Sequence, residues 1–528
     1  MGLRIAFTIS GAVSLGAYEG GALAALVAGL QTVCDGDDPP VYVDVLGGAS
    51  AGSICALLAA WCLRSGLDPV AVFREAWVER ADMASLRRGA RTAPLNGAAL
   101  DTIARVVLTP APDGPARPRQ RRPIKVRMAL TPLRGLQYRI RSLEADVAGG
   151  EDDDVEAVAA ATFVDWCDFE IGPATTAADL LAASGPVDAA LASAANAWAF
   201  PPKWLDRTAV VEKYLANGIT NLPETGGLWF TDGGTVDNEP IGRTLEVVGE
   251  ADADASEADA RLLVLVHPHP GSTTPVDDWA WADRADEPEW LAGALRALRI
   301  MTSQSVHDDL RRLEKVNTRL TWLETFTESL ASAFDRLDDG ARDVLAAAMA
   351  AVLDGIDADR ARLNPGRDVR ADAAGSGDDA DAADLMRRIV ARIGGLRGKR
   401  HVRVDVISPR LVDPLTPVEE LLGGEILVRF GGFLDRELRL NDFRLGYASS
   451  LVWLREGGLE RHGVDGGVAA AILAAAEAAL PGEDSLSADD FRRIGATTVR
   501  DLPVRAKYEL ARLLAHLSRV ILRDLGHD

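Results

Sequence analysis

An apolar run that enters a glycine-rich turn and leaves as a second apolar stretch restricts the fold more than any other feature of this chain. Val41–Leu46 has the composition of a buried strand, Gly47-Gly48 follows it, and an Ala/Leu-rich segment continues to about Leu63. Leu3–Ile9 and Ala17–Leu30 repeat the order of strand and helix. Strands and helices that alternate in this way form right-handed crossovers and a parallel sheet covered on both faces. The sequence therefore predicts an α/β core.

The chain has 528 residues, enough for several domain-sized units, and its composition and expected secondary structure change along its length. Nearly every segment from about residue 287 to 363 is helical, and Asn364–Asp384 is rich in Asp, Ala and Gly, which is typical of a flexible linker. Val402–Ile407 looks like one more strand. We expect a catalytic core over 1–275, a helical insertion over 276–400 with a flexible acidic linker at 364–384, and a last core strand with a helical C-terminal extension over 401–528.

Two apolar seams within the helical block predict a hairpin of helices that packs on a partner. We expect this hairpin to shield part of the sheet or the mouth of a site. The first seam is Leu313, Val316, Leu320, Leu323, Leu330, Phe334 and Leu337, and the second is Val344, Leu345, Ala348, Met349, Val352 and Leu353.

Composition excludes several classes of protein. Lys and Arg number 57 against 79 Asp and Glu, a net charge of −22, whereas a protein that wraps nucleic acid needs a basic footprint. Four cysteines exclude a disulfide scaffold. The apolar run Ile54–Leu63 is too short to span a bilayer, and Gly11, Gly16 and Glu19 interrupt what would be the hydrophobic part of a secretory signal. We expect a soluble, cytoplasmic protein that binds no nucleic acid.

The segment Gly48-Ala49-Ser50-Ala51-Gly52 carries the strongest chemical signal. A strand that enters G-x-S-x-G and leaves as a helix is a nucleophile elbow, whose serine projects from a strained corner. The two glycines permit the tight turn, and the Ala51 N–H points to where an acyl oxyanion would form. A plain Gly/Ser loop at a helix start is the alternative, but the apolar strand and helix around it favour Ser50 as a nucleophile.

Two other segments could complete such a site. Ser10–Gly16 follows the first strand, and its backbone N–H groups could bind an anion, although it could also be a plain connector. Asp232 follows a short strand beside Gly233 and Gly234, where a carboxylate can act as a base toward a hydroxyl. Taken alone, this second segment is better explained as a β-turn with a structural aspartate.

Together, the three segments resemble the patatin-like phospholipase family in order, spacing and flanks. That family has a Gly-rich oxyanion turn, a G-x-S-x-G serine and an Asp in D-G-[GA], and it uses no histidine. Residues 192–195 (ASAA) with Phe200-Pro201-Pro202 resemble the family's A-S-x-A…F-P-P segment, and Asn238-Glu239-Pro240 resembles its N-x-P. The resemblance covers about residues 3–270 and resumes at 402–450, where the chain is similar to the tail of longer bacterial members.

The resemblance implies a three-layer patatin-like core with a mainly parallel central sheet, a helical insertion and a helical C-terminal extension. It also implies hydrolysis of lipid carboxylic esters, of the phospholipase A or lysophospholipase type, through an acyl-enzyme intermediate and a Ser–Asp dyad. No metal or cofactor is expected, and lipid or phospholipid is the expected substrate. The implied site consists of the nucleophile Ser50, the base Asp232, the oxyanion donors Gly11, Ala12, Val13 and Ala51, and the structural glycines Gly48, Gly52 and Gly233.

Departures from the family pattern keep alternatives open. Ala12, Val13 and Leu15 stand where the turn G-G-G-x-R-G has two glycines and the arginine, so the chain could be a degenerate patatin domain that serves as a protein-interaction module. Ser50, Asp232 and His267 also follow the order of a Ser–Asp–His esterase. An acylglycerol lipase or an acyl transfer enzyme would use the same chemistry.

Two patches bear on contact with a membrane. A cluster of cations between Arg117 and Arg127 could meet anionic headgroups, with a solvated loop as the alternative. An apolar stripe in the last helix suits either interfacial binding or packing on the core. Peripheral membrane contact therefore accompanies the expected cytoplasmic location. The stripe is Leu510, Leu513, Leu514, Leu517 and Ile521, opposite Arg512, Arg519 and Arg523.

Overall fold

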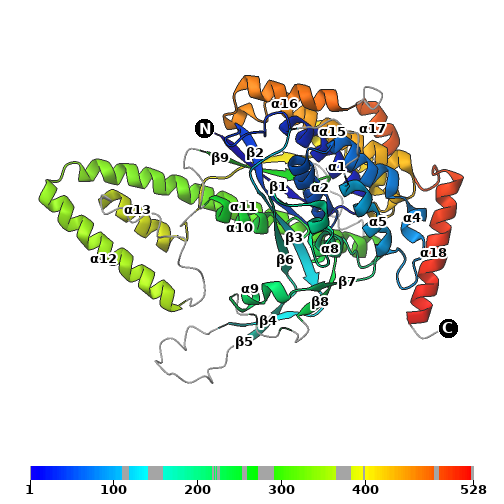
Figure 1. The fold of residues 1–528 in the computed structure, drawn as a ribbon, viewed down its shortest axis with the longest axis horizontal. Coiled ribbons are helices and arrows are strands. Elements are labelled where there is room, and N and C mark those ends of the chain that lie inside the picture. Colours follow the sequence, from blue (N-terminus) through cyan, green and yellow to red (C-terminus); the bar gives the residue numbers. More distant parts are fainter. Residues whose placement is uncertain are drawn as a thin grey trace, which may run out of the picture.

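The computed structural model describes residues 2–109, 118–140, 158–216, 219, 222, 226–252, 259–270, 290–363, 382–396, 399–480 and 487–524. Among these residues, eight strands form a central sheet (Figure 1). They are β1 (Leu3–Ile9), β2 (Val41–Gly48), β3 (Ile124–Pro132), β6 (Asp165–Ile171), β7 (Lys203–Asp206), β8 (Gly227–Thr231), β9 (Ala260–Val266) and β10 (Arg403–Ile407). A separate pair consists of β4 (Leu136–Ile140) and β5 (Val158–Thr162).

The strand order is β10-β9-β1-β2-β3-β8-β7, and β6 also pairs with β3. The strands β10, β9, β1, β2 and β3 run parallel, whereas β6, β8 and β7 are antiparallel to their neighbours. The prediction of a mainly parallel sheet is thus confirmed. The carboxyl ends of β1 and β2 lie side by side, where ligands bind in open α/β sheets.

Helices cover both faces of this sheet. The helices before the insertion are α1 (Gly16–Leu30), α2 (Ala51–Ser65), α3 (Pro69–Arg74), α4 (Met83–Arg87), α5 (Gly97–Leu108), α7 (Ala177–Leu180), α8 (Pro186–Ser193), α9 (Val211–Ala216) and α10 (Ile241–Asp252). Those that follow are α11 (Trp290–Phe334), α12 (Asp339–Leu363), α13 (Ala382–Ile393), α14 (Ile426–Arg429), α15 (Arg436–Arg455), α16 (Gly466–Ala479), α17 (Ala488–Gly495) and α18 (Val504–Asp524).

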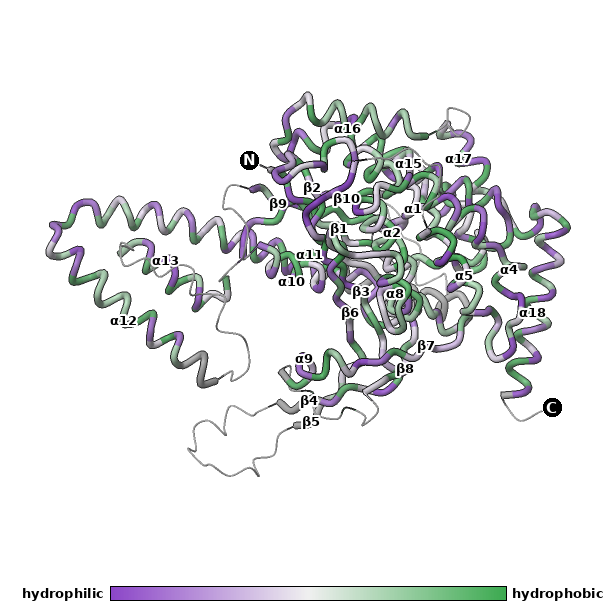
Figure 2. The backbone as a smooth tube through the Cα atoms, viewed as in Figure 1, coloured by the Kyte–Doolittle hydropathy of each residue, from purple (hydrophilic) through white to green (hydrophobic). Residues whose placement is uncertain are grey.

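Alternate residues of β1 divide the core into two layers of side chains. Leu3, Ile5, Phe7 and Ile9 belong to the large cluster that holds α1 and α2, whereas Ala6 belongs to the cluster on the α10 face. Figure 2 shows the hydrophobic colouring concentrated in α1, α2 and the central strands. The arrangement is therefore a three-layer α/β core.

Helix α1 is buried along its whole length. Within the described chain, Val13–Leu30 is the one window long and apolar enough to cross a membrane, and 94% of it is buried inside the protein. Its neighbour α15 crosses it at backbone distance. A Cβ on Gly21 would lie 1.9 Å from the Phe443 oxygen, and a Cβ on Gly446 would lie 1.9 Å from the Tyr18 oxygen. The C-terminal extension therefore packs into the core.

The helical insertion projects from the α10 side of the core (Figure 1). It follows β9, and the chain then returns as β10, which pairs with β9 in parallel, as the expected strand at Val402–Ile407 requires. Asp309 accepts a hydrogen bond from the Gly242 N–H (2.8 Å), and the Asn317 side chain bonds the Val402 backbone (2.8 Å). Of the two expected arrangements, the insertion covers part of the sheet, because Leu313 packs with Leu263 and Leu265 of β9. The described residues of α11–α13 do not line the pocket near Ser50.

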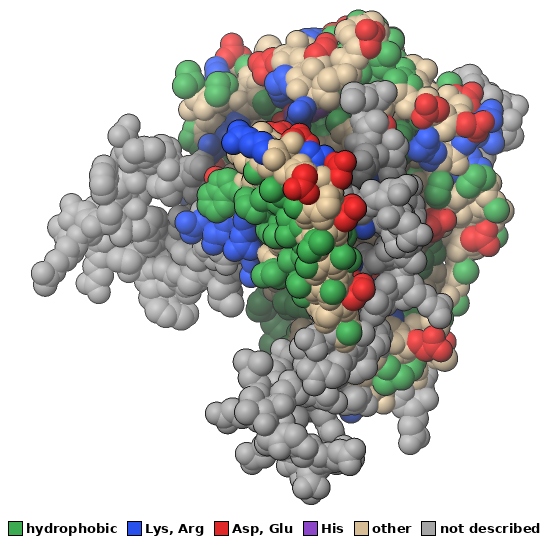
Figure 3. Space-filling view, turned by 90° about the vertical axis from the view of Figure 1, so that its left-hand side faces the viewer, with side chains coloured by type: hydrophobic (Ala, Val, Ile, Leu, Met, Phe, Trp, Pro, Cys, Tyr) green, Lys and Arg blue, Asp and Glu red, His purple; other side chains and the backbone are tan. Residues whose placement is uncertain are grey.

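Only part of each predicted apolar seam is buried. Leu313, Leu320 and Leu323 are buried, whereas Leu337 is 39% exposed. In α12, Met349 and Leu353 are buried, but Val344 is 73% exposed and Val352 53% exposed. The partner of α12 is α13, which covers a single side of it. Figure 3 faces the tip of the hairpin and shows hydrophobic side chains along it.

The linker prediction extends three residues too far. Residues 364–381 lie outside the described residues, but α13 begins at Ala382. Ala382 and Ala383 are buried, at 5% and 4% exposure, and Ala382 packs in one cluster with Met349 and Leu353 of α12. The last part of the predicted linker is therefore helix.

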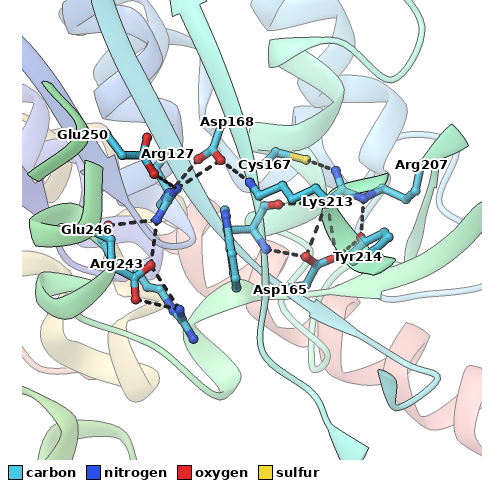
Figure 4. A network of polar contacts seen from close by, with 11 residues as sticks. Arg127, Asp165, Cys167, Asp168, Arg207, Lys213, Tyr214, Arg243, Glu246 and Glu250 are labelled. Carbon is cyan, nitrogen blue, oxygen red and sulfur yellow. Dashed lines mark hydrogen bonds and ion pairs between the residues drawn. The ribbon is translucent and has the colours of Figure 1, made fainter. Parts of the chain in front are cut away.

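A network of charged side chains joins β3 and β6 to α9 and α10 (Figure 4). Arg127 is 3% exposed, and its Nε lies 2.6 Å from the Asp168 carboxylate. The Trp166 ring has the cationic groups of Arg127, Lys213 and Arg243 at 5.2, 4.9 and 4.4 Å from its centroid. Opposite charges are interspersed here, so the network fixes the antiparallel strands.

We predict that Gly446→Ala lowers the free energy of unfolding by about 3 kcal/mol or more, because the new methyl group would overlap the α1 backbone. Chemical denaturation of the full chain measures this change. Gly249→Ala on α10 is the matched control, since a Cβ there meets open space and Ala should stabilise that helix by about 0.5–1 kcal/mol. Equal effects of the two variants would contradict the close crossing.

Candidate active site

Ser50 occupies the sharp corner between β2 and α2. Its backbone has φ 51° and ψ −123°, a conformation that non-glycine residues rarely adopt. A Cβ on Gly48 would lie 2.4 Å from the Gly52 oxygen, and a Cβ on Gly52 would lie 2.4 Å from the Ile9 oxygen. Both glycines thus allow β2 and α2 to pack against the end of β1, as the sequence predicts for an elbow.

Asp232 lies directly beside the Ser50 hydroxyl. The Ser50 Oγ donates to Asp232 Oδ2 over 2.7 Å, and the Gly234 N–H donates to Oδ1 over 2.8 Å. Both side chains are buried, since Ser50 and Asp232 are each 5% exposed. Gly233 has no room for a side chain, because a Cβ there would lie 2.0 Å from the Ala129 oxygen. The structure thus brings together residues separated by 182 positions.

Burial changes the acidity of this carboxyl group. Removal from water raises the pKa of Asp232 to about 6, and the hydrogen bonds from Ser50 and Gly234 act in the opposite direction. Among the described residues, no cation forms an ion pair with Asp232. A carboxylate with a raised pKa is a stronger base toward a hydroxyl than an ordinary aspartate.

Ser193, at the end of α8, holds the elbow from the other side. Its hydroxyl accepts a hydrogen bond from the Ser50 N–H (2.9 Å) and lies 2.8 Å from the Ser53 hydroxyl. The carbonyl of Ala195, two residues after Ser193, accepts a hydrogen bond from the Asp232 N–H (3.0 Å). Sequence reasoning identified the A-S-x-A segment but assigned no role to Ser193. The signal was a small polar residue directly after the apolar stretch 189–192 at the end of this helix.

The turn after β1 passes over Ser50, but Gly11 does not serve as expected. The Gly11 N–H donates to the Asn238 carbonyl over 2.9 Å, so it is already engaged and leaves the expected set of oxyanion donors. A Cβ on Gly11 would lie 3.2 Å from Ser50 Cβ. In the described part of the chain, the N–H groups of Ala12, Val13 and Ala51 donate to no protein oxygen. These three remain candidates for binding an anion.

Val13 has a left-handed backbone, with φ 55°. This conformation costs a non-glycine residue roughly 1–3 kcal/mol and is worst for β-branched side chains. The glycines of the family turn would adopt it freely. Leu15, which stands where the family has arginine, is fully buried in the core. The turn therefore keeps its shape by other means than glycine or arginine.

His267 is not part of the Ser50–Asp232 pair. Its Nε2 lies 2.9 Å from Glu239 Oε1, and its Nδ1 accepts a hydrogen bond from the His269 N–H over 2.8 Å. Both ring nitrogens are therefore engaged away from Asp232. The arrangement expected for a Ser–Asp–His esterase is absent from the described residues.

An apolar pocket opens beside Ser50, and the space of about 860 Å³ that no atom fills there includes the solvent at its mouth. Helices α2, α5 and α8 provide most of its wall, and Trp77 adds an aromatic side chain. Polar side chains are few, so the pocket suits a hydrocarbon chain. It is lined by Val13, Ser50, Ala51, Ile54, Leu57, Leu58, Ala76, Trp77, Ala81, Leu86, Leu100, Ile103, Ala104, Val107, Leu108, Val187, Ala190, Leu191, Ala194, Asn196, Phe200 and Phe433.

We predict that Asp232→Asn stabilises the fold above about pH 7 by about 3 kcal/mol and has no such effect below about pH 4. The pKa of the folded carboxyl, about 6, exceeds its ordinary value, so ionisation destabilises the fold as pH rises through this range. Urea denaturation of both proteins across pH measures the difference, and other groups cancel in it. A constant difference at all pH values would contradict the raised pKa.

A family model covers the part of the chain that holds these residues. Residues 7–245 match the family model described as patatin-like phospholipase, whereas no curated protein matches the chain. The matched range includes the turn after β1, the elbow and Asp232. Residues 7–245 therefore form a domain of the patatin-like phospholipase family, a family of lipid acyl hydrolases.

Proposed function

We propose that the protein hydrolyses carboxylic esters of lipids through an acyl–Ser50 intermediate, with Asp232 as the base. The observation that carries this proposal is the 2.7 Å hydrogen bond from the Ser50 hydroxyl to a buried carboxylate beside an apolar pocket. A free aspartate is a weak base at neutral pH, and burial at Asp232 offsets that weakness. The alternative of a degenerate interaction module leaves this geometry unexplained.

In the first half-reaction, the Ser50 oxygen attacks the ester carbonyl while its proton moves to Asp232. The carbonyl oxygen becomes an oxyanion, for which the N–H groups of Ala12, Val13 and Ala51 are the proposed donors. Asp232 then gives its proton to the leaving alcohol as the tetrahedral intermediate collapses to the acyl-enzyme. In the second half-reaction, Asp232 takes a proton from water, the hydroxide forms the acid, and the proton returns to Ser50.

The pocket favours lipids over small polar esters. Its lining is almost entirely aliphatic and aromatic, and Ser50 lies on its wall. An acyl chain in this pocket would exclude water from Asp232 and keep its carboxyl desolvated. The proposed activity is therefore of the phospholipase A or lysophospholipase type, with the acyl chain as the recognised part.

We predict that the purified chain hydrolyses p-nitrophenyl octanoate faster than the acetate, and that Ser50→Ala and Asp232→Asn each lower turnover by more than about 10³-fold. The rate of p-nitrophenol release measures turnover, and fluorophosphonate labelling reports directly whether Ser50 is reactive. The wild-type rate should fall as pH drops below about 6, because Asp232 must be ionised to accept the proton.

The matched control is Ser65→Ala, which removes a serine hydroxyl from the same helix. The Ser65 hydroxyl donates to the Trp61 carbonyl (2.6 Å) and lies outside the pocket lining. This variant should keep wild-type turnover. A Ser50→Ala protein as active as the control would overturn the assignment of the nucleophile. A wild-type protein that a fluorophosphonate does not label would favour the degenerate interaction module.

Peripheral contact with a lipid surface is part of the proposal, and α18 is its best support. Its inner face packs on the protein, with Leu513 in the same apolar cluster as Phe200 and Phe433 of the pocket lining. Its outer face exposes Val504 (84%), Tyr508 (57%), Leu514 (54%), Ile521 (48%) and Leu522 (49%). Exposed arginines follow one edge of this helix at positions 505, 512, 519 and 523. Apolar and cationic side chains in this pattern suit an anionic bilayer surface.

The cations between Arg117 and Arg127 do not support the same role. Arg117 lies outside the described residues. Arg121 and Arg122 approach Asp35 and Asp38 at 3.4 and 3.2 Å. The buried Arg127 pairs with Asp168. The expectation that this cluster faces anionic headgroups is therefore not supported, whereas the cytoplasmic location stays a prediction.

We predict that Leu514→Asp with Ile521→Asp lowers binding to phosphatidylcholine–phosphatidylglycerol vesicles several-fold, because it puts charge on the apolar strip. Co-sedimentation measures the bound fraction, and hydrolysis of p-nitrophenyl acetate should be unchanged. Val344→Asp, on an exposed position of α12, is the control. Equal loss in both proteins would contradict a docking role for α18.

A further inference from the structure

The turn that carries Val13 is strained, so contacts with other segments of the chain must stabilise it. Val13 has φ 55°, and neither neighbour is a glycine. Residues in such conformations persist where the surrounding structure over-determines them, and they cluster at functional sites. The contacts on each side of Val13 therefore decide whether its N–H can serve as an oxyanion donor.

The N-terminal side of the turn is fixed by the segment that follows Asp232. The Gly11 N–H donates to the Asn238 carbonyl (2.9 Å). The Asn238 side chain donates to Glu239 (2.8 Å), whose carboxylate also contacts His267 (2.9 Å). Gly11 and His267 follow the ends of β1 and β9, and Asn238 and Glu239 lie between β8 and α10, so this side of the turn is tied to the ends of the central strands.

The C-terminal side is fixed by the Ser14 hydroxyl. Ser14 is fully buried, and its Oγ donates to the Arg429 carbonyl (2.5 Å) while it accepts from the Gly432 N–H (3.2 Å). Residues 429–432 lie about 180 positions beyond the end of the family match. One hydroxyl thus joins the turn to the C-terminal extension through both of its hydrogen-bonding functions.

The partner segment is itself held rigidly. The Asp442 carboxylate accepts from the N–H groups of Gly423 and Gly424 (2.7 and 2.8 Å), and the buried Arg439 donates to the Gly432 carbonyl (2.8 Å). Arg439 also donates to the Val78 carbonyl (2.8 Å). The loop that grips Ser14 is therefore anchored to α15 and to the π-helical turn at Glu75–Arg80.

We propose that Ser14 is a positioning residue, which keeps Val13 in its left-handed conformation and its N–H toward the oxyanion. It does so through its two hydrogen bonds to Arg429 and Gly432, which we call the clasp. The inference rests on the proposed function. It assigns to the C-terminal extension a part of the catalytic geometry that the family turn builds from glycine and arginine. Without the clasp, Val13 relaxes to an ordinary negative φ and its N–H leaves the site.

Ser14→Ala tests the clasp with p-nitrophenyl butyrate. The kcat should fall by about 10-fold to 10²-fold with KM nearly unchanged, because an oxyanion donor acts in the transition state. Ser449→Ala is the matched control: it removes an equally buried hydroxyl, bonded to the Leu445 carbonyl (2.8 Å) within α15. A fall in kcat for the control, or none for Ser14→Ala, would overturn the proposal.

Val13→Gly separates positioning from general damage. Glycine adopts φ 55° without strain. The fold-decrease in kcat that Ser14→Ala causes should therefore be smaller by about five-fold or more in the Val13→Gly background than in the wild type. A merely structural serine would give the same loss in both backgrounds, which would overturn the clasp.

The same cycle can be measured by urea denaturation, which needs no substrate. Val13→Gly should raise the denaturation midpoint in the wild type and raise it less in Ser14→Ala, where the strain has already relaxed. Absence of this coupling would contradict the clasp. A wild type that neither hydrolyses the ester nor reacts with a fluorophosphonate would overturn the proposed function alone, since the coupling in stability would still decide the clasp.

Discussion

A carboxylate that faces a serine hydroxyl without a histidine between them has to be kept out of water, and the architecture around Asp232 does this. The segment that follows α8 covers its strand end, since the Ala195 carbonyl accepts from the Asp232 N–H, and Gly233 lies against β3 without space for a methyl group. The same packing raises the pKa of Asp232 to about 6. Basicity and instability therefore have one origin, since ionisation of this group opposes folding.

Short local patterns were sufficient to predict the elements that meet at the site. The boundaries of β1 were predicted to the residue, and the Gly48–Gly52 segment forms the expected strand–turn–helix corner. What the sequence did not reveal depends on contacts between distant segments. The engagement of the Gly11 N–H by Asn238 and the bond from the Ser50 N–H to Ser193 join positions more than a hundred residues apart. Periodicity also failed on α12, because its partner α13 covers only one side and leaves Val344 exposed.

The C-terminal extension contributes to the core more than its distance from the family match suggests. Helix α15 crosses α1 through Gly21 and Gly446, and the preceding loop supplies Phe433 to the pocket wall. Two backbones in contact leave no tolerance for a side chain, so this crossing is fixed in register. Because Ser14 lies in the short turn directly before α1, a shift of α15 along α1 would also displace the loop that binds the Ser14 hydroxyl.

The family match ends at residue 245, before the strand that completes the central sheet. Strand β9 pairs with all seven residues of β1, and the Val266 carbonyl accepts from the Ser10 N–H (3.3 Å) at the beginning of the turn. A chain without β9 would leave β1 as an edge strand, with unpaired N–H and C=O groups next to Ser50. The strain at Val13 can persist only in a turn fixed on both sides. Asn238, inside the family match, bonds the Gly11 N–H, whereas β9 and residues 429–432, beyond the match, supply the other contacts of this turn.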